Sequence, residues 1–79
     1  MTIHLALFAY LSQYQPDGQS GRHARPFDAA DGTTVGELVA RLGLPDGPRA
    51  AFVNGRRAAD DQPLSDGDRL AIFPPIAGG

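Results

Sequence analysis

Apolar and polar residues alternate along the first ten positions of the chain. One face of this segment carries Ile3, Leu5, Leu7 and Ala9, and the other carries His4, Ala6, Phe8 and Tyr10. A period of two is typical of a strand with one buried face, so residues 3–10 are predicted to form a strand. Residues 12–23 are polar and rich in turn-forming residues, which predicts a long loop after this strand.

A stripe of apolar residues with helical spacing follows further along the chain. It recurs at i, i+3, i+4 and i+7, through Val35, Leu38, Val39 and Leu42. Thr34 and Glu37 have the spacing of a capping box, and Gly43 suits the left-handed conformation that ends many helices. A helix this short is not stable alone in water, so we expect it to pack on a sheet.

The other apolar runs predict four more strands, at about residues 24–29, 50–53, 56–58 and 69–73. Asn54-Gly55 is typical of a type I′ hairpin, Ser65–Asp68 of a tight turn, and residues 62–64 are interpreted as a single turn. The order strand–strand–helix–strand–strand–strand predicts an α+β fold of the β-grasp kind. We expect one domain over residues 1–79, a mixed sheet of four to five strands with one main helix across one face.

Composition narrows the classes of protein. A chain of 79 residues forms one domain with a small core. The absence of cysteine excludes disulfides and thiolate sites on this chain. A formal net charge of −2, with no basic cluster larger than Arg56-Arg57, argues against nucleic-acid binding. No apolar run approaches the roughly 18–20 residues of a membrane span, and no signal-peptide pattern follows Met1, so we expect a cytoplasmic protein.

Chemistry-bearing side chains inside the chain form no complete site. One acidic cluster consists of Asp60, Asp61, Asp66 and Asp68. It lacks the full series of oxygen ligands and the bidentate Glu that a hard-cation site has. His4 and His23 have no Cys or Glu at ligand spacing, and the serines have no base beside them. We therefore expect no metal site and no bound cofactor, and Arg56-Arg57 is interpreted as a solvated turn.

The C-terminal segment carries the strongest functional signal. Pro74 and Pro75 end strand pairing and start an extended segment, and Ile76, Ala77, Gly78 and Gly79 complete a flexible tail over residues 74–79. Glycine has no Cβ, so Gly78-Gly79 can enter a narrow passage and leaves the terminal carboxylate unhindered. We expect the Gly79 carboxylate to be the reactive group, with residues 74–77 contacting a partner. Ordinary flexibility of a chain end is the alternative.

Several segments, in this order, resemble a known family. They are Phe8-Ala9, Thr33–Leu38, Val53–Gly55, Leu64–Asp68 and the Phe-Pro-Pro-apolar-x-Gly-Gly ending at Ile72–Gly79. With these segments the chain resembles the ubiquitin-like sulfur carriers of the MoaD/ThiS type over nearly its whole length. The ending is closer to the small subunit of molybdopterin synthase than to the thiamine sulfur carrier. The loop at residues 12–23 departs from the family in being longer and more polar.

The resemblance implies a chemistry for Gly79. An activating enzyme would adenylate its carboxylate with ATP, and a sulfur donor protein would convert it to a thiocarboxylate. The tail would then deliver sulfur inside the large subunit of molybdopterin synthase, while this chain would be a non-catalytic small subunit with no bound cofactor. A carrier for the thiamine or another pathway, a protein modifier conjugated through Gly79, and a regulatory β-grasp domain without terminal chemistry stay open as alternatives.

The alternation also predicts a docking face. If the helix covers one side of the sheet, Ile3, Leu5 and Leu7 join the core, and Phe8 points to the open side. On the last strand Phe73 points the same way, so Phe8 and Phe73 are expected side by side with small alanines between them. An exposed apolar patch beside the tail is typical of a partner surface. The alternative is that residues 12–23 fold over these aromatic rings.

Overall fold

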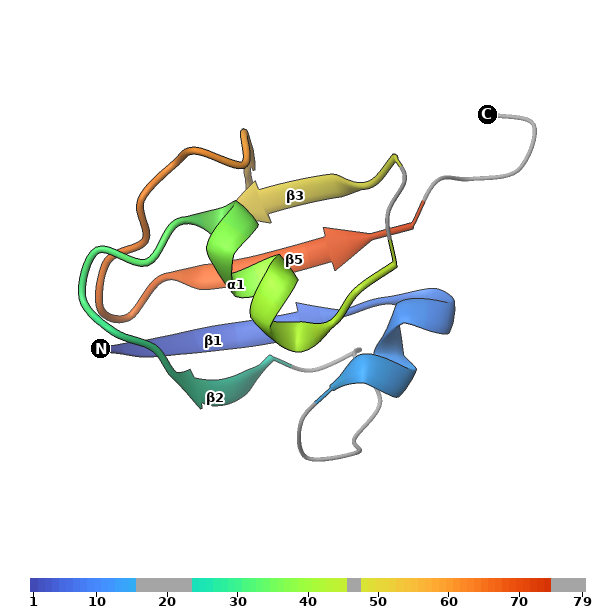
Figure 1. Ribbon diagram of the computed structural model, residues 1–79, viewed down its shortest axis with the longest axis horizontal. Coiled ribbons are helices and arrows are strands. Elements are labelled where there is room, and N and C mark those ends of the chain that lie inside the picture. Colours follow the sequence, from blue (N-terminus) through green and yellow to red (C-terminus); the bar gives the residue numbers. More distant parts are fainter. Residues whose placement is uncertain (16–23, 46–47, 75–79) are drawn as a thin grey trace.

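A mixed five-stranded sheet carries one helix across one of its faces (Figure 1). The computed structural model describes residues 1–15, 24–45 and 48–74. The elements in chain order are β1 (Thr2–Leu7), the 3₁₀ helix η1 (Ala9–Tyr14), β2 (Arg25–Asp28), α1 (Val35–Leu42), β3 (Ala50–Val53), β4 (Arg56–Ala58) and β5 (Arg69–Phe73). The strand order is β2-β1-β5-β3-β4, with β1 and β5 parallel and the other pairs antiparallel. The predicted β-grasp fold is confirmed.

The helix α1 begins and ends as its sequence predicts. The Thr34 hydroxyl accepts a hydrogen bond from the Glu37 N–H at 3.2 Å, and the Glu37 carboxylate accepts one from the Thr34 N–H at 2.9 Å. Hydrogen bonding of the Glu37 carboxylate, first to the Thr34 backbone N–H and then to the Thr34 side chain, holds the pKa of Glu37 below its ordinary value. Gly43 ends the helix with φ of 76°, in the left-handed region that suits glycine.

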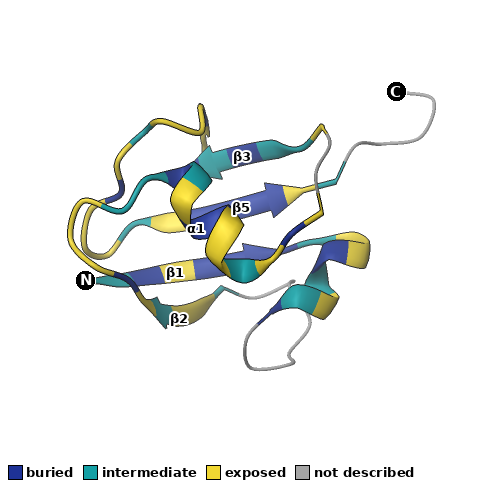
Figure 2. Ribbon diagram, viewed as in Figure 1, coloured by how far each residue is buried: buried dark blue, intermediate teal, exposed yellow. Residues whose placement is uncertain are grey.

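The core lies between α1 and the centre of the sheet (Figure 2). The helix contributes Val35, Leu38 and Val39, while the central strands contribute Ile3, Leu5, Leu7, Leu70 and Ile72. All of these side chains are buried, as the alternation along β1 and β5 predicts. Because α1 covers one face, the opposite face of the sheet has no equivalent layer among the residues that the structure describes.

The strand β1 is shorter than the alternation predicts. It ends at Leu7, and the expected strand over residues 8–10 is wrong. Ala9 has φ of 53°, which no strand residue adopts, and the chain turns there into η1. The expected loop at 12–23 is therefore wrong for residues 12–14, which belong to this 3₁₀ helix, and residues 16–23 lie outside the described part of the chain.

The interpretation of residues 62–64 as a turn is also wrong. This segment lies beside the start of α1, where Pro63 forms a bridge with Thr34. The Val35 N–H donates to the Gln62 carbonyl at 3.0 Å, and the Leu64 N–H donates to the Thr33 carbonyl at 2.8 Å. The backbone on the two sides of Pro63 thus holds Thr33 and Val35 at the start of α1, and the Gln62 carbonyl pairs with one N–H of its first turn. The other predicted turns, at Asn54-Gly55 and around Asp66-Gly67, are confirmed.

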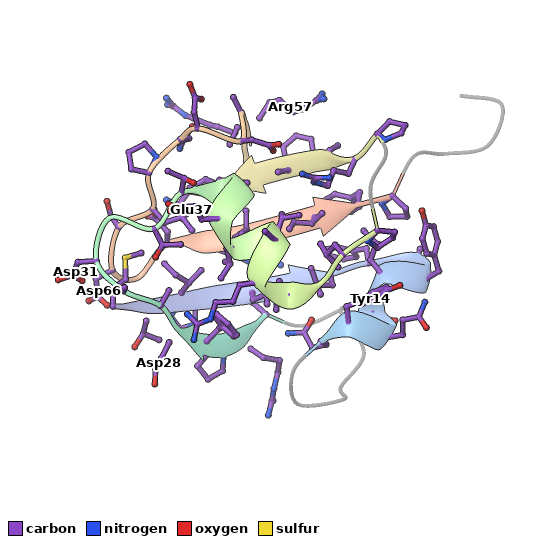
Figure 3. The ribbon with its side chains drawn as sticks, in the orientation of Figure 1. Tyr14, Asp28, Asp31, Glu37, Arg57 and Asp66 are labelled. Carbon is purple, nitrogen blue, oxygen red and sulfur yellow. The ribbon has the colours of Figure 1, made fainter. Side chains whose placement is uncertain are left out.

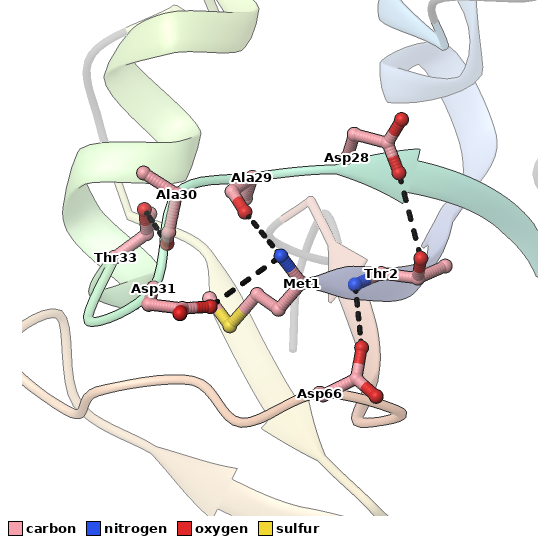
Figure 4. Close-up of polar contacts among 8 residues, drawn as sticks. All are labelled: Met1, Thr2, Asp28, Ala29, Ala30, Asp31, Thr33 and Asp66. Carbon is pink, nitrogen blue, oxygen red and sulfur yellow. Dashed lines mark hydrogen bonds and ion pairs between the residues drawn. The ribbon is translucent and has the colours of Figure 1, made fainter.

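Polar contacts fix the end of the sheet at which β1 begins (Figure 4). The Met1 ammonium donates to the Ala29 carbonyl at 2.8 Å and lies 3.5 Å from a carboxylate oxygen of Asp31. The Thr2 N–H donates to the Asp66 carboxylate at 2.7 Å. Two of the acidic residues near this end therefore hold the backbone of the first strand.

We predict that Thr34→Ala lowers the free energy of unfolding by about 1 kcal/mol, because the first turn of α1 loses its cap. Urea denaturation at neutral pH measures this loss. Since the pKa of Glu37 lies below its ordinary value of 4.5, the stabilisation from its carboxylate is complete above that pH and is lost as the pH falls through the folded pKa. Thr34→Ala keeps the backbone N–H that lowers this pKa most, so it should remove only the smaller part of the pH dependence, whereas Glu37→Gln should remove all of it. Equal urea midpoints for Thr34→Ala and the wild type would contradict the prediction.

Candidate functional site

The open face of the sheet is built from residues that alternate with the core residues. The register places Ala71 of β5 between Ala6 of β1 and Phe52 of β3, and it places Arg57 of β4 beside Phe52. These four residues form one row across the sheet on the side away from α1. Ala6 and Ala71 are nevertheless buried, because their larger neighbours leave them little exposed surface.

Three phenylalanines meet beside this row. The rings of Phe8 and Phe73 are stacked, with centroids 4.2 Å apart and planes inclined by 11°. Phe52 meets Phe73 edge to face at 5.7 Å. The Phe8 N–H donates to the Ile72 carbonyl at 3.1 Å, so the backbone holds Phe8 alongside the end of β5. The predicted proximity of Phe8 and Phe73, with alanines next to them, is confirmed, and Phe73 is 37% exposed.

An open groove of about 1040 Å³ lies over these rings. Its apolar lining includes Phe8, Tyr10, Phe52, Ala71, Phe73 and Pro74, and its charged lining residues are Arg49, Arg57 and Arg69. Pro74 is the first residue of the tail, so the groove reaches the point at which the tail leaves β5. Tyr10 is 54% exposed and reaches the groove from η1 rather than from a strand.

A buried glutamine joins η1 to the edge of the sheet. The Gln15 side chain donates to the Leu5 carbonyl at 3.1 Å and accepts from the Leu7 N–H at 3.2 Å. It is only 4% exposed. The pairing of β1 with β2 ends at the Leu5–Arg25 pair. Beyond that pair, the side-chain amide of Gln15 makes the hydrogen bonds to β1 that a further residue of β2 would otherwise make. This contact secures the η1 segment, from which Tyr10 lines the groove.

The structure brings together three of the predicted site residues, Phe8, Phe73 and Pro74. The others, from Pro75 to Gly79, lie outside the described residues. The sequence reasoning missed Phe52, Gln15 and the arginines. Arg56-Arg57 is part of β4 and not a turn, and the alternation of β4 puts Arg57 on the open face. The same period of two that identified Phe8 would have identified Phe52 and Arg57.

The other candidate clusters have structural partners. Asp68 accepts from the Asn54 amide at 2.9 Å and from the Ser65 N–H at 2.8 Å, and Asp60 pairs with Arg49 at 3.2 Å. Within residues 1–15, 24–45 and 48–74, no three His, Asp or Glu side chains are placed to hold a metal ion. His23 lies outside these ranges. None of the described helices has the length and apolar character needed to cross a membrane.

Comparison with known proteins agrees with this architecture. The sequence matches the model of the ThiS family over residues 17–79. The chain belongs to the ThiS family. The predicted resemblance to the ubiquitin-like sulfur carriers is thereby confirmed.

Relatives of this ThiS-family chain carry several descriptions. The molybdopterin synthase sulfur carrier subunit of Escherichia coli is 50% identical over 38 residues, and this match spans 48% of the chain and 47% of that relative. The crystal structure of SAMP1 from Haloferax volcanii superposes over the whole of both chains with a TM-score of 0.69 and 26% identity. A chain of the protein-protein complex of subunits 1 and 2 of the molybdopterin-converting factor from Helicobacter pylori shares the fold over both full chains, at a TM-score of 0.61 and 23% identity.

We predict that Gln15→Leu lowers the free energy of unfolding by about 1–3 kcal/mol, because the Leu5 carbonyl and the Leu7 N–H lose their buried partner. Gln13→Leu is the matched control, since Gln13 is an exposed residue of the same 3₁₀ helix and should change stability by less than about 0.5 kcal/mol. Urea denaturation measures both variants. Hydrogen exchange of the Leu7 amide should accelerate in Gln15→Leu alone; equal behaviour of the two variants would show that the amide contacts do not secure η1.

Proposed function

We propose that this chain is a sulfur carrier for molybdopterin biosynthesis, with its Gly79 carboxylate converted to a thiocarboxylate. The observation that carries the proposal is the aromatic groove at the root of the tail, on the one face of the sheet that α1 leaves uncovered. Membership of the ThiS family and the similarity to the sulfur carrier subunit of E. coli support it.

The chemistry follows from the properties of a carboxylate. A free carboxylate is a poor electrophile, so an adenylating enzyme must first join Gly79 to AMP, with ATP as the source and pyrophosphate as the leaving group. The terminal sulfur of a persulfide on the donor protein then forms a C–S bond as the C–O bond to AMP breaks, and a thiol reductant cleaves the S–S bond of the resulting acyl disulfide to free the thiocarboxylate. The product is a nucleophilic sulfur on a tether, and tethering raises its effective concentration at an acceptor. This chain supplies the reactive group, and its partners supply the catalytic side chains.

The groove provides the place where a partner binds. We infer that the large subunit of molybdopterin synthase covers Phe8, Phe52 and Phe73, while Pro74, Pro75, Ile76 and Ala77 lead Gly78-Gly79 into its active site. The H. pylori complex supports this partner, because a chain of the same fold occurs there in a complex of subunits 1 and 2. Fully extended, residues 75–79 can reach at most roughly 18 Å beyond Pro74. The acceptor site must therefore lie within that distance of the docked face.

A protein modifier is the second candidate function. The similarity to SAMP1 favours it, since that protein is described as small archaeal modifier protein 1. The same activated Gly79 would then be captured by a lysine amine of a target protein. Intact mass and peptide analysis after co-expression with a bacterial sulfur-activation system separate the candidates. Replacement of one oxygen by sulfur supports the carrier, and an isopeptide-linked adduct supports the modifier. An unmodified chain would leave only a plain binding domain.

We predict that deleting Gly79, or appending one serine after it, abolishes sulfur loading. The reactive carboxylate would be displaced from the end of the passage that the two glycines fit. Intact-mass measurement reports loading. Thermal unfolding should stay unchanged, because the tail follows the last strand and contributes no residue to the described core. Loading of the extended variant at the wild-type level would show that Gly79 is not the reactive residue.

We predict that Phe73→Ser weakens binding to the large subunit by at least about tenfold, because a central aromatic anchor is removed from the interface. The loss of stability should be smaller, about 0.5–1.5 kcal/mol, since Phe73 is partly exposed and mainly loses its contacts with Phe8 and Phe52. Calorimetric titration and urea denaturation measure the two effects. Unfolding of this variant would show that Phe73 is a core residue and that the docking face is elsewhere.

A further inference from the structure

The charged side chains that line the groove are all arginines. Arg49, Arg57 and Arg69 contribute to the lining, and among the residues that the structure describes no Asp or Glu does. The chain as a whole carries a formal net charge of −2, so the charge of the described groove lining is opposite in sign to the net charge of the molecule. Figure 3 shows Asp28, Asp31 and Asp66 together near the start of β1, well away from Arg57.

The three arginines differ in how much charge they can offer a partner. The Arg49 Nη2 lies 3.2 Å from a carboxylate oxygen of Asp60, and its side chain is only 20% exposed. Arg57 and Arg69 are exposed, and neither forms an ion pair with another residue in the described part of the chain. Arg57 and Arg69 are therefore the main positive charges on the rim of the groove.

Backbone contacts fix where these two arginines lie. Arg57 stands beside Phe52 in the β3–β4 register. Arg69 begins β5, and its N–H donates to the Asn54 side-chain oxygen at 3.0 Å, while Asn54 also donates to Asp68. The hairpin at Asn54-Gly55 is thus tied to β5, which keeps the arginine-bearing ends of β4 and β5 at the same side of the aromatic rings.

We propose that the partner surface that covers this groove is an apolar centre ringed by carboxylates, which Arg57 and Arg69 align. The inference deepens the proposed function, on which it rests, by assigning a charge pattern to the large subunit. Guanidinium groups form two parallel hydrogen bonds with a carboxylate, so they fix orientation as well as adding attraction. Complementary charges at an interface mainly accelerate association and exclude wrong partners.

A nucleic acid fits these observations less well than an acidic protein surface. Nucleic-acid affinity comes largely from neutralising many phosphates. Within residues 1–15, 24–45 and 48–74 the groove offers three arginines, one of them already paired, on a chain of net negative charge. The stacked Phe8 and Phe73 rings also bury part of each other's faces, which leaves less aromatic surface for bases.

The neighbouring arginine provides a matched control. Arg56 pairs with Val53, a core residue, whereas Arg57 pairs with Phe52 of the groove. The two side chains therefore lie on opposite faces of the same short strand, and both are exposed. Arg56→Glu and Arg57→Glu change the net charge of the chain equally, so a difference between them reports position rather than total charge.

The test is stopped-flow association of each variant with the fluorescently labelled large subunit of molybdopterin synthase from the same organism, at about 50 mM and about 500 mM NaCl. At low salt, Arg57→Glu should slow association about tenfold, Arg57→Gln about threefold and Arg56→Glu less than twofold. At high salt these differences should shrink toward the wild-type rate. Thermal unfolding of the two Glu variants checks that both are equally folded.

Each outcome decides the proposal. If the wild type binds and Phe73→Ser does not, but Arg56→Glu and Arg57→Glu behave alike, the acidic ring is wrong while the proposed docking face stands. If the wild type does not bind the large subunit at all, the proposed partner and the acidic ring are both wrong. Binding of a single-stranded oligouridylate that Arg57→Glu abolishes and Arg56→Glu preserves would assign the arginines to nucleic acid instead.

Discussion

The parallel pairing of β1 with β5 is the contact on which the rest of the structure depends. It places the first and last strands side by side at the centre of the sheet, in a register that sets Leu5 beside Leu70 and Leu7 beside Ile72. These residues form the middle of the core. Parallel strands need a long crossover, and the segment with α1 provides it. The same pairing brings Phe8 and Phe73 to the same end of the sheet, where the chain leaves toward its tail.

A one-helix fold leaves a sheet face that other groups must protect. On this face small residues, Ala6 and Ala71, fill the centre, and aromatic rings that stack on each other lie beside them. Arg57 stands beside Phe52, and an arginine covers apolar surface with its stem while its charged head stays in water. The face is therefore compatible with a free, folded chain and is still apolar enough to bind. A second helix over this face would close the groove at the root of the tail.

The sequence predicts well wherever a local signal decides the structure. The helix α1 has its period, its capping box and Gly43, and the packing of Phe8 against Phe73 follows from alternation on two neighbouring strands. It fails where the deciding contact is distant. Alanine is not a residue type that predicts a positive φ, so the turn at Ala9 has no signal in the sequence. The role of Gln15 depends on where β2 stops pairing with β1. Alternation along residues 50–53 and 56–58 would have placed Phe52 and Arg57 on the open face, but it does not show that the two residues are direct neighbours, which is a property of the register of β3 with β4. The residues with the strongest sequence signal, Gly78 and Gly79, lie outside the described part of the chain, so their role is still a prediction.

The position of the groove reduces the part of the chain that must be ordered in the proposed mechanism. Contacts at Phe8, Phe52 and Phe73 would fix the last residue of β5 against the partner, so that only the residues after Pro74 must find the passage. A short tether to a docked face gives its tip a high effective concentration at the acceptor, and a longer or more distant tether would dilute it. Binding energy gained at the face, away from the reacting atoms, can then offset the entropy lost when the tail is ordered. In such a carrier the folded domain and the tail act as one unit, because the strand that completes the sheet is also the strand that delivers the tail.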